Sequence, residues 1–221
     1  MSCLSRDTNE MYAHSENERS LWDKWNAGGG PQYPRDEVVR FFFRRFKDEN
    51  NRKKTRALDL GCGGGVHTVY LAQSGFETMA CDISPEGVKK TEQRLAREKD
   101  KSLRADAFVA SIEEIDLPSA SLDAILSVGV FECTLPGVVE IAMPKIADLL
   151  RPGGAGFFIF ASDKDYRVGS AQNPYVRRGF TESDVRSIFT ASFAELDINR
   201  IIRTEQNQSI ELNEWMVTAT K

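Results

Sequence analysis

The sequence predicts an α/β protein in which a doubly wound sheet of seven strands carries helices on both faces. Three observations predict this fold. Short, uniformly apolar runs alternate with helical segments from about residue 56 onward, which is typical of parallel strands buried on both faces. A glycine-rich turn joins the first of these strands to the helix that follows it. About seven residues join the last two strands, too few for a helical crossover, so we expect these strands to pair antiparallel.

The first 54 residues are expected to form a lid and a helix packed on the core, not a separate domain. Residues 1–20 are polar, and residues 21–34 (LWDKWNAGGGPQYP) mix aromatic residues with three glycines. A helix is expected after Pro34, with acidic residues in its first turn and basic residues in its last, which complements the helix dipole. The side chains expected on its apolar face are those of Val38, Val39, Phe42, Phe43 and Phe46.

The elements of the core, residues 55–221, follow from apolar runs and punctuating residues. In the first half we expect strands at 57–60, 76–82 and 103–110, a helix at 66–73, and a helix capped by Ser84 that ends near residue 99. In the second half we expect strands at 122–131 and 155–162, with a helix at 137–150 that contains Pro144 and is ended by RPGG at 151–154. After a polar loop at 163–180, we expect a helix at 182–190 capped by Thr181, then strands at 193–203 and 211–220.

Composition excludes several classes of protein. With 221 residues, 41% hydrophobic residues and a net charge of −4, the chain is neither disordered nor basic enough for broad, charge-driven nucleic-acid binding. It has no apolar window of about 18 residues and no apolar core at its N-terminus, so we expect neither a membrane span nor a signal peptide. The four cysteines, Cys3, Cys62, Cys81 and Cys133, form no CxxC pair, and only His14 and His67 are histidines. We therefore expect no metal site, buried thiols and a reducing, cytoplasmic setting.

The glycine-rich turn, residues 58–65 (LDLGCGGG), narrows the choice of ligand. Its spacing is GxGxG, and Val66 occupies the position of the third glycine in the dinucleotide fingerprint. Asp59, two residues before the first glycine, would repel a pyrophosphate but suits an ammonium group. Asp82 closes the second strand 21 residues after Gly61, where a carboxylate accepts hydrogen bonds from ribose hydroxyls.

An amino acid at one end and a ribose at the other, without phosphates, describe S-adenosylmethionine (SAM). The sequence DLGCGGG, Asp82 in ACDIS, and RPGG before the fifth strand resemble a class I SAM-dependent methyltransferase over residues 55–162. The resemblance implies a Rossmann-like sheet closed by an antiparallel C-terminal hairpin, with SAM as cofactor and S-adenosylhomocysteine as product. It also implies a SAM-dependent methyltransferase domain over residues 55–221. A Rossmann-like domain that binds another nucleotide, or none, is the alternative.

The resemblance also assigns roles by position. Asp59 would hold the methionine ammonium directly or through water, Asp82 would take the ribose hydroxyls, and Ile83 would pack on adenine. No Asp stands where the family binds the adenine amino group, so Ser111, Glu113 or the backbone N–H of Ile112 would substitute. The cofactor-binding candidates are Asp59, Gly61, Cys62, Gly63, Gly65, His67, Asp82, Ile83, Ser111, Ile112, Ser127 and Trp25.

No catalytic residue is fixed by the sequence, and the candidates are Glu132, His67 and Tyr166. Glu132 is either a base or binder of a cationic acceptor, or a solvated residue at a helix start. His67 is either near the cofactor carboxylate, as in the tellurite-resistance methyltransferases that the chain resembles, or a helix-surface residue. We expect Cys133 to be a packing residue and not a catalytic one. A general base is needed only if the nucleophile must first lose a proton.

Two segments are candidate lids. Trp22, Trp25 and Tyr33 have the WDxxW…Y spacing that resembles thiopurine-methyltransferase-like enzymes, and an aromatic face can stabilise a sulfonium cation. The alternative is that these rings are ordinary core. The loop 163–180 carries Tyr166, Arg167, Tyr175, Arg177 and Arg178, which would recognise an anionic or aromatic acceptor unless the loop is merely solvated.

The sequence thus predicts an enzyme that transfers a methyl group from SAM to a small-molecule acceptor by in-line displacement, with no membrane partner. A methyltransferase of protein or nucleic acid is the first alternative, although residues 127–130 (SVGV) lack the tetrapeptide of amine-modifying nucleic-acid enzymes. A non-catalytic SAM-binding module is the second. The oligomeric state and the acceptor atom are not predicted.

Overall fold

The computed structural model describes residues 17–207 and 209–221, so Cys3 and His14 lie outside the described residues. Residues 17–27 are helical. The later helices are α2 (Asp36–Arg45), α3 (Glu49–Arg52), α4 (Val66–Gln73), α5 (Pro85–Ala96), α6 (Val138–Leu149) and α7 (Glu182–Thr190). The strands are β1 (Arg56–Leu60), β2 (Glu77–Asp82), β3 (Ala105–Val109), β4 (Leu122–Val128), β5 (Leu150–Ala161), β6 (Glu195–Glu205) and β7 (Ile210–Thr220). None of the helices in the described part of the chain is long and apolar enough to cross a membrane.

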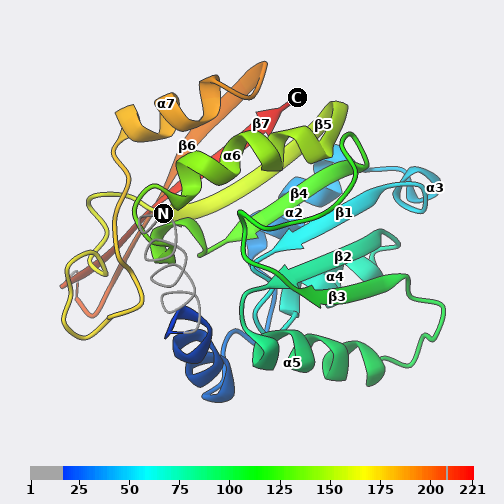
Figure 1. The fold of residues 1–221 in the computed structure, drawn as a ribbon, viewed down its shortest axis with the longest axis horizontal. Helices are drawn as coiled ribbons and strands as arrows, with labels where there is room; N and C mark the ends of the chain where they lie inside the picture. Colours follow the sequence, from blue (N-terminus) through cyan, green and yellow to red (C-terminus); the bar gives the residue numbers. More distant parts are fainter. Residues whose placement is uncertain (1–16, 208) are drawn as a thin grey trace, which may run out of the picture.

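The strands form one seven-stranded sheet in the order β3-β2-β1-β4-β5-β7-β6 (Figure 1). The first five strands are parallel, and β7 pairs antiparallel with both β5 and β6. The chain starts in the middle of the sheet at β1, winds outward to β3, returns to β4 and winds outward in the other direction. This arrangement confirms the doubly wound, Rossmann-like sheet with an antiparallel C-terminal hairpin.

Two apolar clusters cover the two faces of the sheet. On one face, Leu58, Ile125 and Phe158 pack with the apolar residues of α6 and α7, and Figure 1 shows α6 crossing the sheet there. On the other face, the neighbouring residues Ala57 and Phe157 pack with those of α2 and α4. Because successive side chains of a strand point to opposite faces, a strand buried on both sides is apolar throughout. This double burial explains the uninterrupted apolar runs in the sequence.

Two helix caps stand where the sequence predicts them. The Ser84 hydroxyl accepts a hydrogen bond from Gly87 N at 3.0 Å at the start of α5. Thr181 and Asp184 form a reciprocal capping box at the start of α7. These side chains satisfy backbone donors that the first helical turn leaves without partners.

Strand β4 ends three residues earlier than the apolar run suggests. It stops at Val128, Gly129 takes a left-handed conformation with φ of 73°, and Phe131–Cys133 form a 3-10 turn. The prediction of a strand over 122–131 is therefore wrong at its end. Phe131 is apolar because it packs on Phe158 and Phe160, with ring centroids 5.5 and 5.4 Å away, and not because it continues the strand.

The RPGG segment also differs from the prediction, because it lies inside β5 and does not precede it. Leu122 of β4 pairs with Leu150 while Ala124 pairs with Ala155, so residues 151–154 bulge out between these two pairs. The bulge is held by the C-terminus, where Gly153 N donates to Lys221 O at 3.1 Å and Lys221 N donates to Gly154 O at 3.0 Å. This long-range pairing makes the segment part of the strand.

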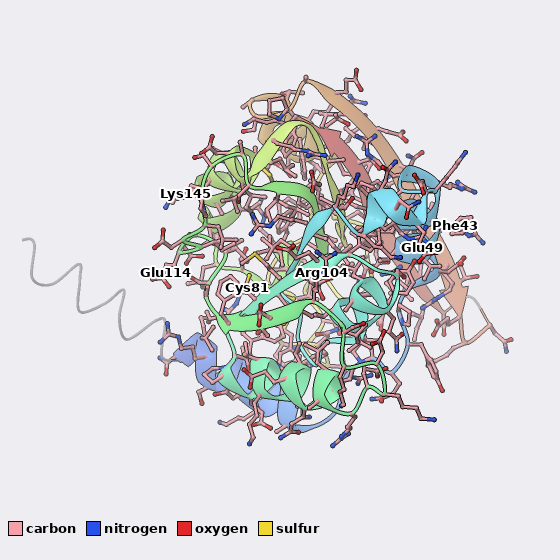
Figure 2. All side chains as sticks on the ribbon, turned by 90° about the vertical axis from the view of Figure 1, so that its right-hand side faces the viewer. Phe43, Glu49, Cys81, Arg104, Glu114 and Lys145 are labelled. Atoms are coloured by element: carbon pink, nitrogen blue, oxygen red, sulfur yellow. The ribbon has the colours of Figure 1, made fainter. Side chains whose placement is uncertain are left out.

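The prediction that Phe43 lies on the apolar face of α2 is wrong. Phe43 is 67% exposed, and Figure 2 shows it at the margin of the molecule. Phe41 packs instead, stacked on Phe157 of β5 with ring centroids 4.4 Å apart. Residues 38, 41 and 42 follow the i, i+3, i+4 spacing of one helix face, whereas residue 43 is turned well away from it. Burial of Phe41, Phe42 and Val38 fixes α2 against the sheet.

Candidate functional site

A cavity of about 410 Å³ lies at the carboxyl ends of the parallel strands. This end of an open α/β sheet, where the strand order reverses, is where such folds bind ligands. Segments after β1, β2, β3, β4 and β5 contribute to its wall, as do the helix 17–27 and β7. The residues that line the cavity include Glu18, Trp22, Trp25, Asn26, Arg35, Gly61, Cys62, Gly63, His67, Asp82, Ile83, Ser111, Ile112, Glu113, Glu132, Cys133, Leu135, Val138, Arg167, Tyr175, Val176 and Glu214.

The glycine loop is shaped by close packing on two neighbouring segments. Gly61 has a φ of 77°, and a Cβ there would lie 2.2 Å from Cγ2 of Val130. Gly65, the N-cap of α4, has a φ of 78°, and its Cβ would lie 2.9 Å from Cα of Thr91 in α5. Any side chain at either position would therefore collide with its neighbour. Gly61 and Gly63 line the cavity, whereas Gly65 serves the packing of α4 on α5 and is not part of the wall.

Asp82 joins the glycine loop to the start of α5. Its Oδ2 accepts from Gly63 N at 2.8 Å, and its Oδ1 accepts from Ser84 N at 2.9 Å. Burial raises the pKa of this carboxyl, and the two backbone donors oppose that rise. Each oxygen keeps a further lone pair for a ligand donor.

Asp59 lies behind the loop and does not line the cavity. It is 2% exposed, and its Oδ2 accepts from Thr68 Oγ1 at 2.6 Å. Burial raises its pKa to about 7. In this structure Asp59 supports the first turn of α4, so a direct contact with a ligand ammonium has no geometric support here.

The residues that follow β2 and β3 line one part of the cavity. Ile83 and Ile112 contribute apolar side chains, and Ser111 and Glu113 contribute polar ones. The Ser111 hydroxyl donates to Glu114 Oε2 at 2.8 Å. Ser127, by contrast, is 2% exposed inside β4, paired with Leu60 and Phe158, and does not reach the cavity.

His67 is a buried wall residue, so the helix-surface alternative is wrong. It is 8% exposed, and its Nε2 accepts from the backbone N–H of Arg35 at 3.2 Å. Burial, with a smaller contribution from the nearby Arg35 charge, lowers its pKa to about 4. The imidazole is therefore neutral at pH 7, with one of its two nitrogens already engaged.

The helix over residues 17–27 covers the cavity and is fastened to the start of α5. Asp23 Oδ1 accepts from Ser84 Oγ at 2.5 Å and from Glu86 N at 3.0 Å. Trp22 and Trp25 line the cavity, with ring centroids 5.9 Å apart. The side chain of Tyr33 is 83% exposed and does not line the cavity.

The 163–180 loop reaches the cavity, but its arginines are already paired. Arg167 bonds to Asp165 at 2.8 Å and to Glu214 at 2.9 Å. Arg177 pairs with Glu18, and Arg178 bonds to Glu140 at 3.0 Å. The idea that this loop offers basic charge to an anionic acceptor therefore loses its structural basis. Tyr175 does line the cavity and lies 5.4 Å from the Trp22 ring, whereas Tyr166 is 44% exposed and lies outside the wall.

Glu132 is buried in the wall with no partner for its carboxyl group among the described residues. It is 1% exposed, and neither Oε1 nor Oε2 accepts a hydrogen bond there. Burial raises its pKa to about 7, although Arg167 and the nearby backbone groups of Glu132 and Ala161 favour the charged form. The solvated helix-start alternative is therefore wrong. Cys133 beside it is half-buried, and burial raises the pKa of its thiol.

The wall residues that are not predicted from the sequence include Asn26, Arg35 and Glu214. Arg35 bonds to Glu214 across the cavity at 2.8 Å, although 179 positions separate them in the chain. Asn26 is 1% exposed, and its Oδ1 lacks a partner in the part of the chain that the structure describes. The position of Asn26 one helical turn after Trp22, and the presence of Glu214 inside a buried strand, are signals that could have found two of them.

The described residues contain no group of three or more His, Cys, Asp or Glu side chains that could hold a metal ion. The chemistry that the cavity offers is therefore that of carboxyl groups, paired guanidiniums, a neutral imidazole and aromatic rings.

Comparison with known proteins agrees with this geometry. Residues 57–154 match a family model described as a methyltransferase domain. The chain is 30% identical over 139 residues to a ubiquinone biosynthesis O-methyltransferase of Xanthomonas axonopodis pv. citri, covering 62% of this chain and 56% of that protein. It is 29% identical over 125 residues to the corresponding protein of Sinorhizobium medicae, covering 57% of this chain and 48% of that protein. The chain thus spans about half the length of the curated relatives it matches.

The fold is similar to that of a solved methyltransferase structure. A Haemonchus contortus phosphoethanolamine N-methyltransferase 2, in complex with phosphomonomethylethanolamine and S-adenosylhomocysteine, superposes with a TM-score of 0.69 at 16% identity. That superposition covers 91% of this chain and 57% of the other. The family match over residues 57–154 and the sheet order support a SAM-dependent methyltransferase domain, with SAM as its cofactor.

Proposed function

We propose that the chain transfers a methyl group from SAM to a small-molecule acceptor by in-line displacement. The observation that carries this proposal is that one small cavity joins the cofactor loop to an acceptor wall. Gly61 packs directly on Val130, two residues before Glu132, so ligands at the loop and at Glu132 share the same space. A volume of about 410 Å³ lies in the range of small-molecule binding sites.

The residues of the cavity fit SAM chemically. Asp82 has free lone pairs for ribose hydroxyls, and Ile83 and Ile112 offer an apolar wall to adenine. The backbone of Gly61, Cys62 and Gly63 would line the methionine portion. The orphaned amide oxygen of Asn26, which lies 3.5 Å from the Cβ position of Gly63, needs a donor such as an ammonium or hydroxyl.

Other residues at the cavity would interact with the charged groups of SAM. Bound SAM supplies an electrophilic methyl group carried by a sulfonium. Trp25 would face that cation, and an aromatic face stabilises a cation by about 0.5–2 kcal/mol. The neutral His67 would border the methionine carboxylate, while Asp59 would act only through water or through α4. The sites proposed at Gly65, Ser127 and Tyr166 have no support from the cavity geometry.

The N-terminal 54 residues would serve as a lid and helix laid on a methyltransferase domain of residues 55–221. Contacts of Asp23 with α5 and of Phe41 with β5 support this division. The aromatic lid supports the small-molecule type that the thiopurine and tellurite-resistance methyltransferases represent. A lid that excludes water favours displacement at the methyl carbon over side reactions.

Isotope-labelled SAM tests the proposal. The chain is incubated with labelled SAM and separate pools of small molecules, transfer RNA, DNA and cell protein. We expect label only in the small-molecule pool. Label in a macromolecule would contradict the proposed acceptor class, and SAM binding without transfer to any pool would indicate a non-catalytic module.

A further inference from the structure

The cavity as a whole carries an excess of negative charge. Its wall holds five carboxyl groups, those of Glu18, Asp82, Glu113, Glu132 and Glu214, against two guanidiniums, those of Arg35 and Arg167, and Glu18 is also paired with Arg177. Both guanidiniums are bound to Glu214, at 2.8 and 2.9 Å, and His67 is neutral. With Arg177 included, the ionised wall has a net charge of −2, and SAM contributes only +1. The occupied site therefore still favours a second cation.

Glu132 is the wall residue best suited to bind that cation. Its two carboxylate oxygens are buried and have no hydrogen-bond partner in the described part of the chain. A buried carboxylate without a partner is costly, and its cost falls when a ligand supplies donors. The titratable and charged groups that act on it are Arg167, Glu214 and the neighbouring Cys133, and none of these donates to it.

The surroundings of Glu132 define the rest of the ligand. Trp22 and Tyr175 form an aromatic wall with ring centroids 5.4 Å apart. Leu135, Val138 and Val176 add aliphatic surface to the same cavity. Aromatic faces and a carboxylate together suit an ammonium group on an apolar skeleton. No unpaired arginine of the 163–180 loop lines the wall to receive an anionic group.

We propose that the acceptor is an amine on an apolar skeleton, bound as its ammonium by Glu132, which removes a proton from the nitrogen. This inference rests on the proposed function and names its substrate class. The carboxylate takes one ammonium proton and leaves a neutral amine with a free lone pair. The nitrogen–carbon bond then forms as the carbon–sulfur bond breaks, and the electron pair of that bond stays on sulfur. The products are the methylated ammonium and S-adenosylhomocysteine, and Glu132 later loses its proton to solvent.

Four probes with one skeleton separate this proposal from other acceptor chemistries. Phenethylamine, phenethyl alcohol, phenethyl mercaptan and hydrocinnamate differ only in the reacting group. With isotope-labelled SAM, we expect the amine to be methylated and the carboxylate to be inert. Preferential methylation of the thiol or the carboxylate overturns the proposal, and so does a chain that binds SAM but does not methylate the amine.

Glu132→Gln tests the role of the carboxyl group, because it keeps the shape and removes both the charge and the base. We expect kcat/KM for the amine to fall at least about 100-fold, the usual size of a general-base contribution, with the Kd for SAM unchanged. Glu140→Gln is the matched control, since Glu140 pairs with Arg178 outside the cavity, and we expect its kcat/KM to stay near that of the native chain.

The pH profile distinguishes a proton-accepting role from a structural one. For the native chain, kcat/KM for the amine should rise about tenfold per pH unit until Glu132 ionises near pH 7. Glu132→Gln should lose this rise. Full amine methylation by Glu132→Gln, or an unchanged profile, overturns the proposal. Failure of the native chain to bind SAM is a different result, because it defeats the proposed function itself.

Discussion

Three carboxyl groups near the carboxyl ends of neighbouring strands differ in how their oxygens are used. Asp82 accepts two backbone N–H groups and so shapes the glycine loop. Asp59 accepts the Thr68 hydroxyl and supports α4. Glu132 accepts nothing within the described residues. The hydrogen-bond partners thus separate structural carboxyl groups from the one that is available for chemistry.

Asp82→Ala should weaken SAM binding by about 1–3 kcal/mol, because it leaves hydrogen-bond donors of the ligand and of the loop without partners. Titration calorimetry measures the change. Asp106→Ala, at an exposed position on the edge strand β3, is the control and should leave the Kd unchanged. An unaltered Kd for Asp82→Ala would show that the ribose is not placed at this carboxylate.

The ionisation of Glu132 should also appear in stability. Its pKa is raised from 4.5 to about 7 in the folded chain, so the folded state holds this proton more tightly than the unfolded state. The associated stabilisation is present below about pH 4.5 and is lost as the pH rises through about 7. At about 1.4 kcal/mol per pKa unit, this loss is on the order of 3 kcal/mol.

Urea unfolding of the native chain and of Glu132→Gln, at about pH 5 and about pH 8, measures this effect. The free energy of unfolding of Glu132→Gln relative to the native chain should be higher at the upper pH. A difference between the two chains that does not vary with pH would mean that Glu132 titrates normally.

At the scale of elements, the helix over residues 17–27 belongs to the site as much as the glycine loop does. Asp23 caps the start of α5, and Lys90 of α5 bonds to the Asn26 carbonyl oxygen. The same helix places Trp22, Trp25 and Asn26 on the cavity wall. Closure of the cavity therefore depends on how this helix docks on α5.

Asp23→Ala should loosen the helix by about 0.5–2 kcal/mol, the usual cost of losing a helix N-cap. Because the helix carries wall residues, SAM binding should weaken by a similar amount, which calorimetry detects. Lys24→Ala, at an exposed position of the same helix, is the control. Equal SAM affinity in the two variants would show that the helix is not coupled to the cofactor site.

At the scale of the whole molecule, Glu214 joins three parts of the chain that are distant in sequence. It lies in β7, is 4% exposed, and bonds to Arg35 before α2 and to Arg167 after β5. Asp165 completes the network by accepting from Arg167 and from Asn213 N. A shared carboxylate thus fastens the N-terminal segment and the 163–180 loop to the C-terminal hairpin.

Glu214→Ala should lower the free energy of unfolding by about 3 kcal/mol, because it leaves two partly buried guanidiniums without their shared partner. Denaturant unfolding provides the measurement. Thr204→Ala, at an exposed position of the paired strand β6, should change stability by less than about 0.5 kcal/mol. If both variants unfold alike, the network does not stabilise the fold.

Local patterns predict the elements well, whereas contacts between distant segments escape them. The helix at Val66–Gln73 has its predicted bounds, because an apolar pattern and Gly75 define it locally. The RPGG bulge depends on hydrogen bonds to Lys221, which is distant in the sequence. The pairing of Arg35 with Glu214 depends on the folded sheet in the same way. The glycine loop can therefore be predicted from the sequence, whereas the ion pairs that neutralise the arginines of the 163–180 loop cannot.

Titration calorimetry of the native chain with SAM and with S-adenosylhomocysteine measures whether the cavity binds this cofactor. We expect one site per chain for each ligand, and competition between the two ligands for that site. Binding of neither ligand at millimolar concentration would show that the chain does not use SAM.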